Sequence, residues 1–316
     1  MEYRLLGRTG LQLSAIGFGA APLGGVYHPT SGAEACRAVR AAIDAGINFF
    51  DVAPYYGLTL AESRLGEALE GRRGEIILCS KCCRFGLDEF DFSARRVATS
   101  LEESLARLRT DHLDLFIAHD IEFGGLRQVV EETLPAMQRA REAGKVRYLG
   151  VSGYPLGVLA YAARQSPLDF VLSYCHDNLM NTRLQSELLP VARELGLGLI
   201  NASPLHMGVL TEGGPPEWHP APAAVLEAGR KVVEICRRHG TPVATAALRF
   251  ALDEPGLSSV LVGMTSVEEL ETNLRALDYR LPPELLEAIG RAVAPVRDLE
   301  WASGREHPEL PGRPPA

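Results

Sequence analysis

Long apolar runs and clusters of basic side chains are both missing from this 316-residue chain. No apolar segment approaches the roughly 20 residues that a membrane-spanning helix needs, and Met1-Glu2-Tyr3-Arg4 does not open a secretory signal. The net charge is −8, from 32 basic and 40 acidic side chains, which disfavours binding to nucleic acid. We therefore expect a cytoplasmic protein with neither a membrane nor a nucleic-acid partner.

Cysteine is scarce, and the six that occur are typical of reduced thiols rather than of a disulfide framework. Cys79 and Cys82 match a C-x-x-C pattern, but positions three apart in a strand face opposite sides and no second pair follows. The sequence therefore predicts no metal site. A glycine-rich dinucleotide fingerprint is also absent, because Gly17-Phe18-Gly19 is followed by Ala20-Ala21-Pro22.

Short apolar runs alternate with helical patterns along almost the whole chain. The predicted strands cover 15–19, 47–51, 75–80, 113–118, 146–151, 168–173, 197–202 and 257–262. The predicted helices lie near 33–45, 59–69, 93–108, 126–143, 156–163, 183–195, 223–239, 243–252 and 266–277. Apolar strands that alternate with helices favour a parallel sheet covered on both faces, and eight such units favour a closed (β/α)8 TIM barrel.

We predict a single α/β domain over residues 1–316, with an N-terminal β-hairpin within 4–14 and extra C-terminal helices. The proline-rich tail, 296–316, is predicted to be mostly loop, although Trp301 suggests that part of it docks. Working residues in such barrels lie at the C-terminal ends of the strands.

Four titratable residues lie at the ends of three successive predicted strands. Asp51, Lys81 and His119 end these strands, and Tyr56 follows Asp51 in the next turn. A nearby ammonium such as Lys81 lowers the pKa of a phenol, and Asp51 would pair with that ammonium on burial. His119 would orient a substrate oxygen. This set suits proton transfer coupled to hydride transfer, although a buried Asp–Lys pair beside an unrelated tyrosine and a core histidine would leave the same pattern.

The set resembles the catalytic tetrad of the aldo-keto reductase superfamily. The resemblance extends over nearly the whole chain, and the segments 119–124, 172–176, 211–220 and 258–264 are similar to its aldose 1-dehydrogenase subgroup. It implies that Tyr56 is the acid–base, tuned by Lys81 and Asp51, and that His119 orients the substrate. The neighbouring Tyr55 is assigned to the substrate pocket.

The resemblance also implies where a nicotinamide cofactor binds. The implied cofactor residues are Ser152, Ser173, Ser203, Leu205, Gly208, Gly263, Thr265, Glu269 and Asn273. Gly153, Ser173 and Ala202 depart from the usual asparagine, glutamine and aromatic residue. Members that prefer NADP carry a basic pair at the positions of Gly263 and Glu269. Because Glu269 would repel a 2′-phosphate and could accept a bond from a free ribose hydroxyl, NAD is expected and NADP is disfavoured.

The implied activity is NAD-dependent oxidation of the anomeric hydroxyl of an aldose, of the L-galactose or L-fucose type, to the lactone. Candidate sugar contacts are Tyr55, Asp120, His176, Trp218 and Trp301. Two alternatives stay open, an NADPH-dependent aldehyde reductase and a non-catalytic cofactor-binding subunit. A monomer and a homodimer are both compatible with the sequence.

Overall fold

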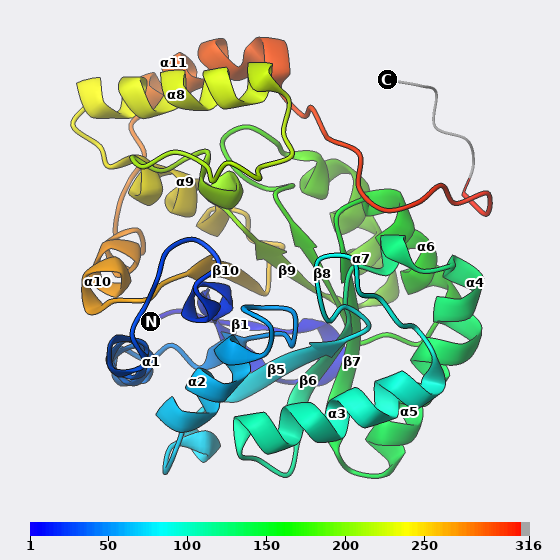
Figure 1. Ribbon diagram of the computed structural model, residues 1–316. Helices are drawn as coiled ribbons and strands as arrows, with labels where there is room; N and C mark the ends of the chain where they lie inside the picture. Colours follow the sequence, from blue (N-terminus) through cyan, green and yellow to red (C-terminus); the bar gives the residue numbers. More distant parts are fainter. Residues whose placement is uncertain (311–316) are drawn as a thin grey trace.

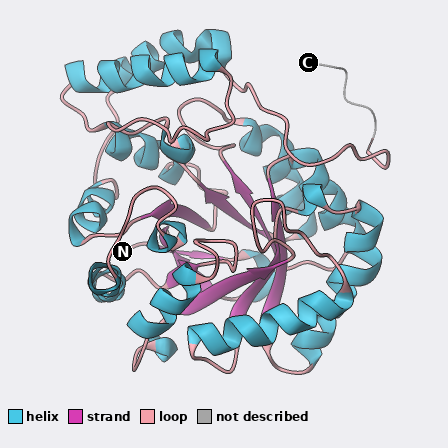
Figure 2. Ribbon diagram, viewed as in Figure 1, coloured by secondary structure: helices cyan, strands magenta, loops and turns pink. Residues whose placement is uncertain are grey.

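The computed structural model describes residues 1–310, and its centre is a closed barrel of eight parallel strands (Figures 1 and 2). The order around the barrel is β10-β3-β4-β5-β6-β7-β8-β9, which confirms the predicted (β/α)8 architecture. The barrel strands are β3 (Ile16–Gly19), β4 (Phe49–Asp51), β5 (Ile77–Cys82), β6 (Leu113–Ala118), β7 (Val146–Gly153), β8 (Phe170–Tyr174), β9 (Gly198–Ala202) and β10 (Ser259–Gly263). The predicted hairpin is also present, as β1 (Tyr3–Leu5) paired antiparallel with β2 (Gln12–Ser14).

Helices surround the barrel as an outer layer (Figure 2). They are α1 (Gly32–Asp44), α2 (Leu60–Ala68), α3 (Ala94–Leu108), α4 (Leu126–Gln128), α5 (Leu134–Glu142), α6 (Leu156–Gln165), α7 (Leu189–Leu195), α8 (Ala223–Arg238), α9 (Val243–Leu252), α10 (Val267–Arg275) and α11 (Pro283–Val293). Short helical turns lie at Gly7–Thr9, Ala21–Gly24, Arg73–Glu75, Ile121–Phe123, His206–Gly208 and Ala294–Val296. Within residues 1–310, none of these helices has the length and apolar character needed to cross a membrane.

Successive side chains of each strand point alternately into the barrel and out toward the helices, and they thereby form two apolar cores. Side chains that point inward, among them Phe49, Leu115 and Phe170, form the interior cluster of the barrel. Their neighbours, among them Phe50 and Phe116, pack outward against the helices. Because both faces are covered, all six residues of β6 are buried, as expected for a parallel sheet.

The two extra helices, α8 and α11, lie side by side outside the barrel ring (Figure 1). Val225 and Val232 of α8 share an apolar cluster with Leu285 and Ile289 of α11. Of the expected extra C-terminal helices, α11 follows the last helix of the barrel, whereas α8 is inserted between β9 and α9.

Two of the predicted continuous helices contain a widened π turn. Val129–Thr133 separates α4 from α5, and Leu184–Leu188 precedes α7. Pro135 and Pro190 follow these turns at the start of the next helix. Proline has no N–H for the ordinary i to i−4 hydrogen bond, which accounts for the local change of helical pitch.

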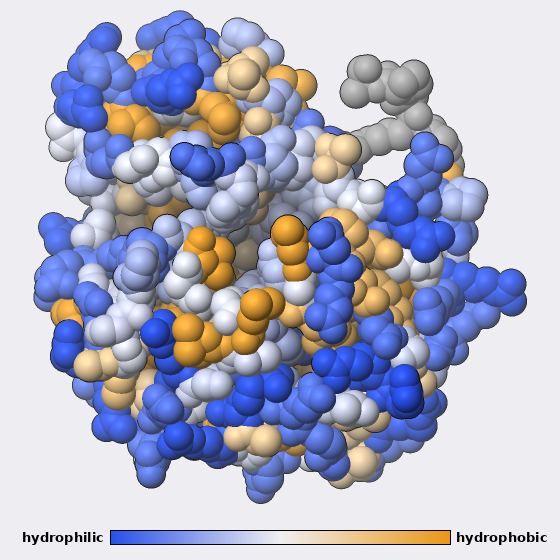
Figure 3. All heavy atoms as spheres, viewed as in Figure 1, coloured by the Kyte–Doolittle hydropathy of each residue, from blue (hydrophilic) through white to orange (hydrophobic). Residues whose placement is uncertain are grey.

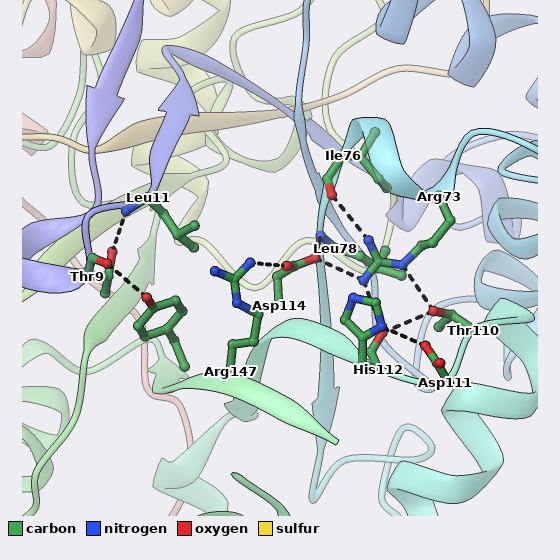
Figure 4. A network of polar contacts seen from close by, with 11 residues as sticks. Thr9, Leu11, Arg73, Ile76, Leu78, Thr110, Asp111, His112, Asp114 and Arg147 are labelled. Carbon is green, nitrogen blue, oxygen red and sulfur yellow. Dashed lines mark hydrogen bonds and ion pairs between the residues drawn. The ribbon is translucent and has the colours of Figure 1, made fainter. Parts of the chain in front are cut away.

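A polar network joins neighbouring strands at the N-terminal end of β6 (Figure 4). The buried Asp114 carboxylate accepts hydrogen bonds from Arg73 and Arg147, each at 2.9 Å, and from the Leu78 N–H at 3.0 Å. Burial alone would raise the pKa of Asp114, but these three donors hold it below its usual value. Asp114 lies at the N-terminal end of β6, whereas His119 follows its C-terminal end. The network around Asp114 therefore stabilises the end of the barrel opposite His119.

Residues 297–310, which follow the last short helical turn, contain no helix or strand and dock on the barrel. Trp301 stacks on Tyr154 with ring centres 4.3 Å apart, in agreement with the expected docking. Glu300 pairs with Arg183 and His176, and Ser303 donates to Glu122. The final part of the predicted loop, 311–316, lies outside the described residues.

Candidate active site

The four residues singled out by the sequence meet at one end of the barrel. Asp51 is the last residue of β4, Lys81 lies near the end of β5, and His119 follows β6 directly. Tyr56 comes from the loop after β4, and its ring centre is 5.8 Å from that of His119. Since parallel strands present their C-terminal ends on the same face, three strands bring these groups together.

Lys81 and Asp51 form a buried ion pair at the base of this cluster. Lys81 Nζ lies 2.5 Å from Asp51 Oδ2 and donates a second bond to the Val52 carbonyl at 2.9 Å. The two residues are only 1% and 4% exposed. Burial lowers the pKa of Lys81, but the charge and hydrogen bond of Asp51, together with Tyr56 and Cys79, raise it by more, so the ammonium stays charged.

The phenol of Tyr56 differs in one respect from the sequence expectation. Lys81 Nζ is 4.8 Å from the Tyr56 ring centre and lowers the pKa of Tyr56, as expected. Burial is the larger effect, and together with Asp51 and Asp120 it raises that pKa to about 12. The predicted effect of Lys81 is therefore present but is outweighed, because burial removes the solvation of the phenolate.

His119 is 5% exposed and electrically neutral across the physiological range. Burial lowers its pKa to about 3, and the charges of Lys81 and Arg84 act in the same direction against the attraction of Asp120. A neutral imidazole in this position can donate a hydrogen bond to a substrate oxygen without carrying charge.

A cavity of about 630 Å³ opens beside the cluster and is lined in part by Asp51 and Tyr56. The viewed face is hollowed near its centre, with hydrophobic side chains at the rim of the hollow (Figure 3). Five expected cofactor residues line the cavity, namely Ser203, Leu205, Gly208, Gly263 and Glu269. Ala202 also lines it, at the position where an aromatic ring is usual in the family.

The residues present fit a nicotinamide cofactor on two observations. The Ser152 hydroxyl is buried and has no hydrogen-bond partner within the described part of the chain. Ser152 shares strand parity with Tyr148 of the interior cluster, so its side chain faces inward. At Gly263, an added Cβ would lie 2.7 Å from Pro22, and so only glycine keeps this wall of the cavity open.

Four expected cofactor residues do not line the cavity, namely Ser152 and the three described next, Ser173, Thr265 and Asn273. Ser173 lies next to Leu172 of the interior cluster, so its side chain points outward, and its hydroxyl is 3.1 Å from His176 Nδ1. Thr265 and Asn273 are buried. Thr265 donates to Glu269 through its N–H at 2.6 Å and its hydroxyl at 3.0 Å, and it thereby holds the carboxylate at the cavity.

The expected sugar contacts separate into two groups. Tyr55 and Asp120 lie at the catalytic cluster, because the Tyr55 ring centre is 6.4 Å from that of His119 and Asp120 is adjacent to it. His176 is fully buried and bonded to Glu300, Trp301 packs on Tyr154, and Trp218 is 53% exposed beside Tyr27. The structure does not bring this second group to the tetrad.

Three residues at the site were missed by the sequence reading. Tyr27 and His28 line the cavity from the loop after β3, and His28 Nε2 is 3.7 Å from Glu269 Oε1. Arg84, in the loop after β5, pairs with Asp120 at 2.6 Å. Their positions after strand ends were the available signal, but loop conformation decides which side chains turn inward.

The geometry is that of an oxidoreductase, and comparison with known proteins agrees. The model of the aldo/keto reductase family matches residues 15–294. The chain therefore belongs to this family, whose members use nicotinamide cofactors.

Individual relatives are similar over almost their full length. L-galactose dehydrogenase of Arabidopsis thaliana is 44% identical over 314 residues, which cover 96% of this chain and 98% of the relative. D-threo-aldose 1-dehydrogenase of Pseudomonas sp is 30% identical, with 90% and 95% covered. The holo form of aldo-keto reductase AKR11C1 from Bacillus halodurans is 25% identical, with a TM-score of 0.79, and the match covers 97% of this chain and 100% of that one.

Proposed function

We propose that this protein is an NAD-dependent aldose 1-dehydrogenase that oxidises the anomeric hydroxyl of a sugar of the L-galactose or L-fucose type to the lactone. The observation that carries the proposal is the cluster of Asp51, Lys81, Tyr56 and His119 at the C-terminal ends of β4, β5 and β6, where Asp51 and Tyr56 line the cavity. The 44% identity to a plant L-galactose dehydrogenase supports the substrate class.

The oxidation removes a hydride from C1 of the sugar and a proton from its anomeric hydroxyl. A nicotinamide cofactor, when bound, would supply the acceptor for that hydride. Tyr56 takes the hydroxyl proton, because it lines the cavity and lies against Lys81, whereas Asp51 is held in its ion pair with that lysine. Lys81 stabilises the phenolate that must form before each proton transfer, and Asp51 keeps the ammonium in place.

His119 donates a hydrogen bond to the anomeric oxygen and so sets the face of the sugar that meets the cofactor. A neutral imidazole suits this role. A positively charged ring would attract the hydroxyl and the developing carbonyl alike, and it would repel the Lys81 ammonium. Ser152, whose hydroxyl has no hydrogen-bond partner among residues 1–310, would hold the carboxamide group of the cofactor.

Glu269 supports the preference for NAD. Its carboxylate lines the cavity and is held by Thr265. This negative charge would repel the two negative charges of a 2′-phosphate. A 2′-hydroxyl could instead donate to it.

The test is initial-rate formation of reduced cofactor with L-galactose, L-fucose, D-arabinose and pyridoxal, with NAD and again with NADP. Fast NADH formation with L-galactose or L-fucose, and recovery of the lactone, is the expected result. Turnover confined to aldehydes with NADPH would replace the proposal by an aldehyde reductase. Cofactor binding without turnover of any substrate would indicate a non-catalytic subunit.

A further inference from the structure

The residue after the catalytic histidine carries a buried carboxylate that turns back toward it. Asp120 adopts a left-handed backbone conformation, with φ of 50°, which aspartate tolerates better than most residues. As a result Asp120 Oδ1 lies 3.6 Å from Nε2 of the His119 ring.

The two oxygens of Asp120 differ in their partners. Oδ2 accepts a hydrogen bond from Arg84 Nη1 at 2.6 Å. Oδ1 has no hydrogen-bond partner in residues 1–310, although Asp120 is only 2% exposed. A separation of 3.6 Å is too long for a hydrogen bond to His119, and a buried acceptor without a donor is costly. The molecule therefore holds an unused acceptor beside the reacting position.

Arg84 keeps this carboxylate in place. Its guanidinium carbon lies 3.8 Å from the Tyr55 ring centre and 5.2 Å from that of Phe90. Phe90 in turn stacks on Phe123 with ring centres 4.4 Å apart. The cation is thus sandwiched among rings and paired with Asp120, so that the carboxylate has little freedom to rotate.

The negative charge of this region is concentrated on Asp120. The neighbouring Glu122 is fully buried, and burial together with the charge of Asp120 raises the pKa of Glu122 to about 8. Glu122 is therefore mostly protonated at neutral pH and adds little negative charge beside the Arg84–Asp120 pair.

We propose that Asp120, clamped by Arg84, accepts a hydrogen bond from the sugar hydroxyl on C2, the carbon next to the reacting one. Neighbouring oxygens of a vicinal diol lie about 3 Å apart, one hydrogen-bond length. One oxygen can therefore meet His119 Nε2 while the other meets Asp120 Oδ1. His119 and Asp120 together select substrates with a hydroxyl on C2, because an apolar group there would leave the Asp120 carboxylate without a hydrogen-bond donor. This inference rests on the proposed aldose oxidation.

The test combines a change in the protein with a change in the substrate. The kcat/KM values of the wild type and of Asp120→Asn are measured with L-galactose and with 2-deoxy-L-galactose. The asparagine keeps the shape of the side chain, but its NH₂ can replace the acceptor at Oδ1. We expect the wild type to lose about ten- to a hundredfold on the deoxy sugar, the value of one charge-assisted hydrogen bond. The kcat/KM values of the variant for the two sugars should lie within about threefold of each other.

Binding gives a second readout that does not need turnover. In a Tyr56→Phe background, the Kd of each sugar for the protein with NADH is measured by calorimetry, with and without Asp120→Asn. The substitution should weaken binding of L-galactose and leave the deoxy sugar nearly unchanged.

Two outcomes would overturn the inference. Equal rates of the wild type with both sugars would show that no group reads the C2 hydroxyl. A loss in Asp120→Asn by the same factor for both sugars would show that Asp120 acts only by orienting His119. Failure of the proposed function looks different, because the wild type would then oxidise neither sugar; that result removes this inference as well.

Discussion

The Lys81 ammonium lies 2.5 Å from the Asp51 carboxylate, and both side chains are almost fully buried. Removing one partner of a buried ion pair leaves an uncompensated charge and costs about 3–5 kcal/mol. We therefore expect Lys81→Met and Asp51→Asn each to lower the free energy of unfolding by roughly this amount. The double variant should lose clearly less than the sum, as urea denaturation of the four proteins would show. Additive losses would mean that the two side chains contribute independently.

Tyr56→Phe removes the proton acceptor and little else. The ring remains to pack beside His119 and Lys81, so the fold and the binding of nucleotide should persist. We expect kcat to fall by about 10²–10⁴-fold, the usual contribution of a positioned acid–base group. NADH titration by fluorescence should give a Kd close to that of the wild type. Turnover near the wild-type level would remove Tyr56 from the chemistry.

Glu122 should make stability depend on pH in a direction opposite to that of most carboxylates. Burial raises its pKa from 4.5 in the unfolded chain to about 8 in the folded protein. The folded state therefore holds a proton that the unfolded state loses above pH 4.5, and stability declines as pH rises from about 4.5 to 8. Glu122→Gln removes this term, so the variant should gain on the wild type across that window, by on the order of a few kcal/mol.

Asp114→Asn is the matched control for Glu122→Gln. The Asp114 pKa is lowered by the Leu78 N–H, Arg73 and Arg147, which outweigh the effect of burial. The contribution of Asp114 to the free energy of unfolding is present above the pKa of aspartate in the unfolded chain. It is lost as the pH falls through the lower pKa of Asp114 in the folded protein. The cost of Asp114→Asn should accordingly be largest near neutral pH and should shrink in acid. A flat difference for Glu122→Gln between pH 4.5 and 8 would contradict the assignment.

Glu269 should control the choice of cofactor. Glu269→Gln removes the negative charge that a 2′-phosphate meets, so the ratio of kcat/KM for NADP to that for NAD should rise by about three- to tenfold, less at high salt. Glu268→Gln makes the same change one residue away, on a side chain that does not line the cavity, and should leave the ratio unchanged. Equal effects of the two substitutions would point to the general field of the protein.

The barrel and the tetrad were predictable because both follow from local pattern. Alternating apolar runs and helices specify parallel strands, and parallel strands bring residues such as Asp51, Lys81 and His119 to one face. The outward orientation of Ser173 was not predictable, since moving the alternation by one residue reverses every side chain of a strand. The raised pKa of Tyr56 depends on burial by segments remote in sequence. The pairing of Arg84 with Asp120 depends on loop conformation, which short-range patterns do not specify.

The central claim is that this cluster transfers the C1 hydrogen of an aldose to a nicotinamide. The most direct test uses L-galactose labelled with deuterium at C1, incubated with NAD and the enzyme, with the recovered cofactor examined by mass spectrometry. Our account predicts NADH that carries the deuterium, an unlabelled lactone product, and a slower rate than with unlabelled sugar. Recovery of all the deuterium in the sugar, with no labelled NADH, would contradict it.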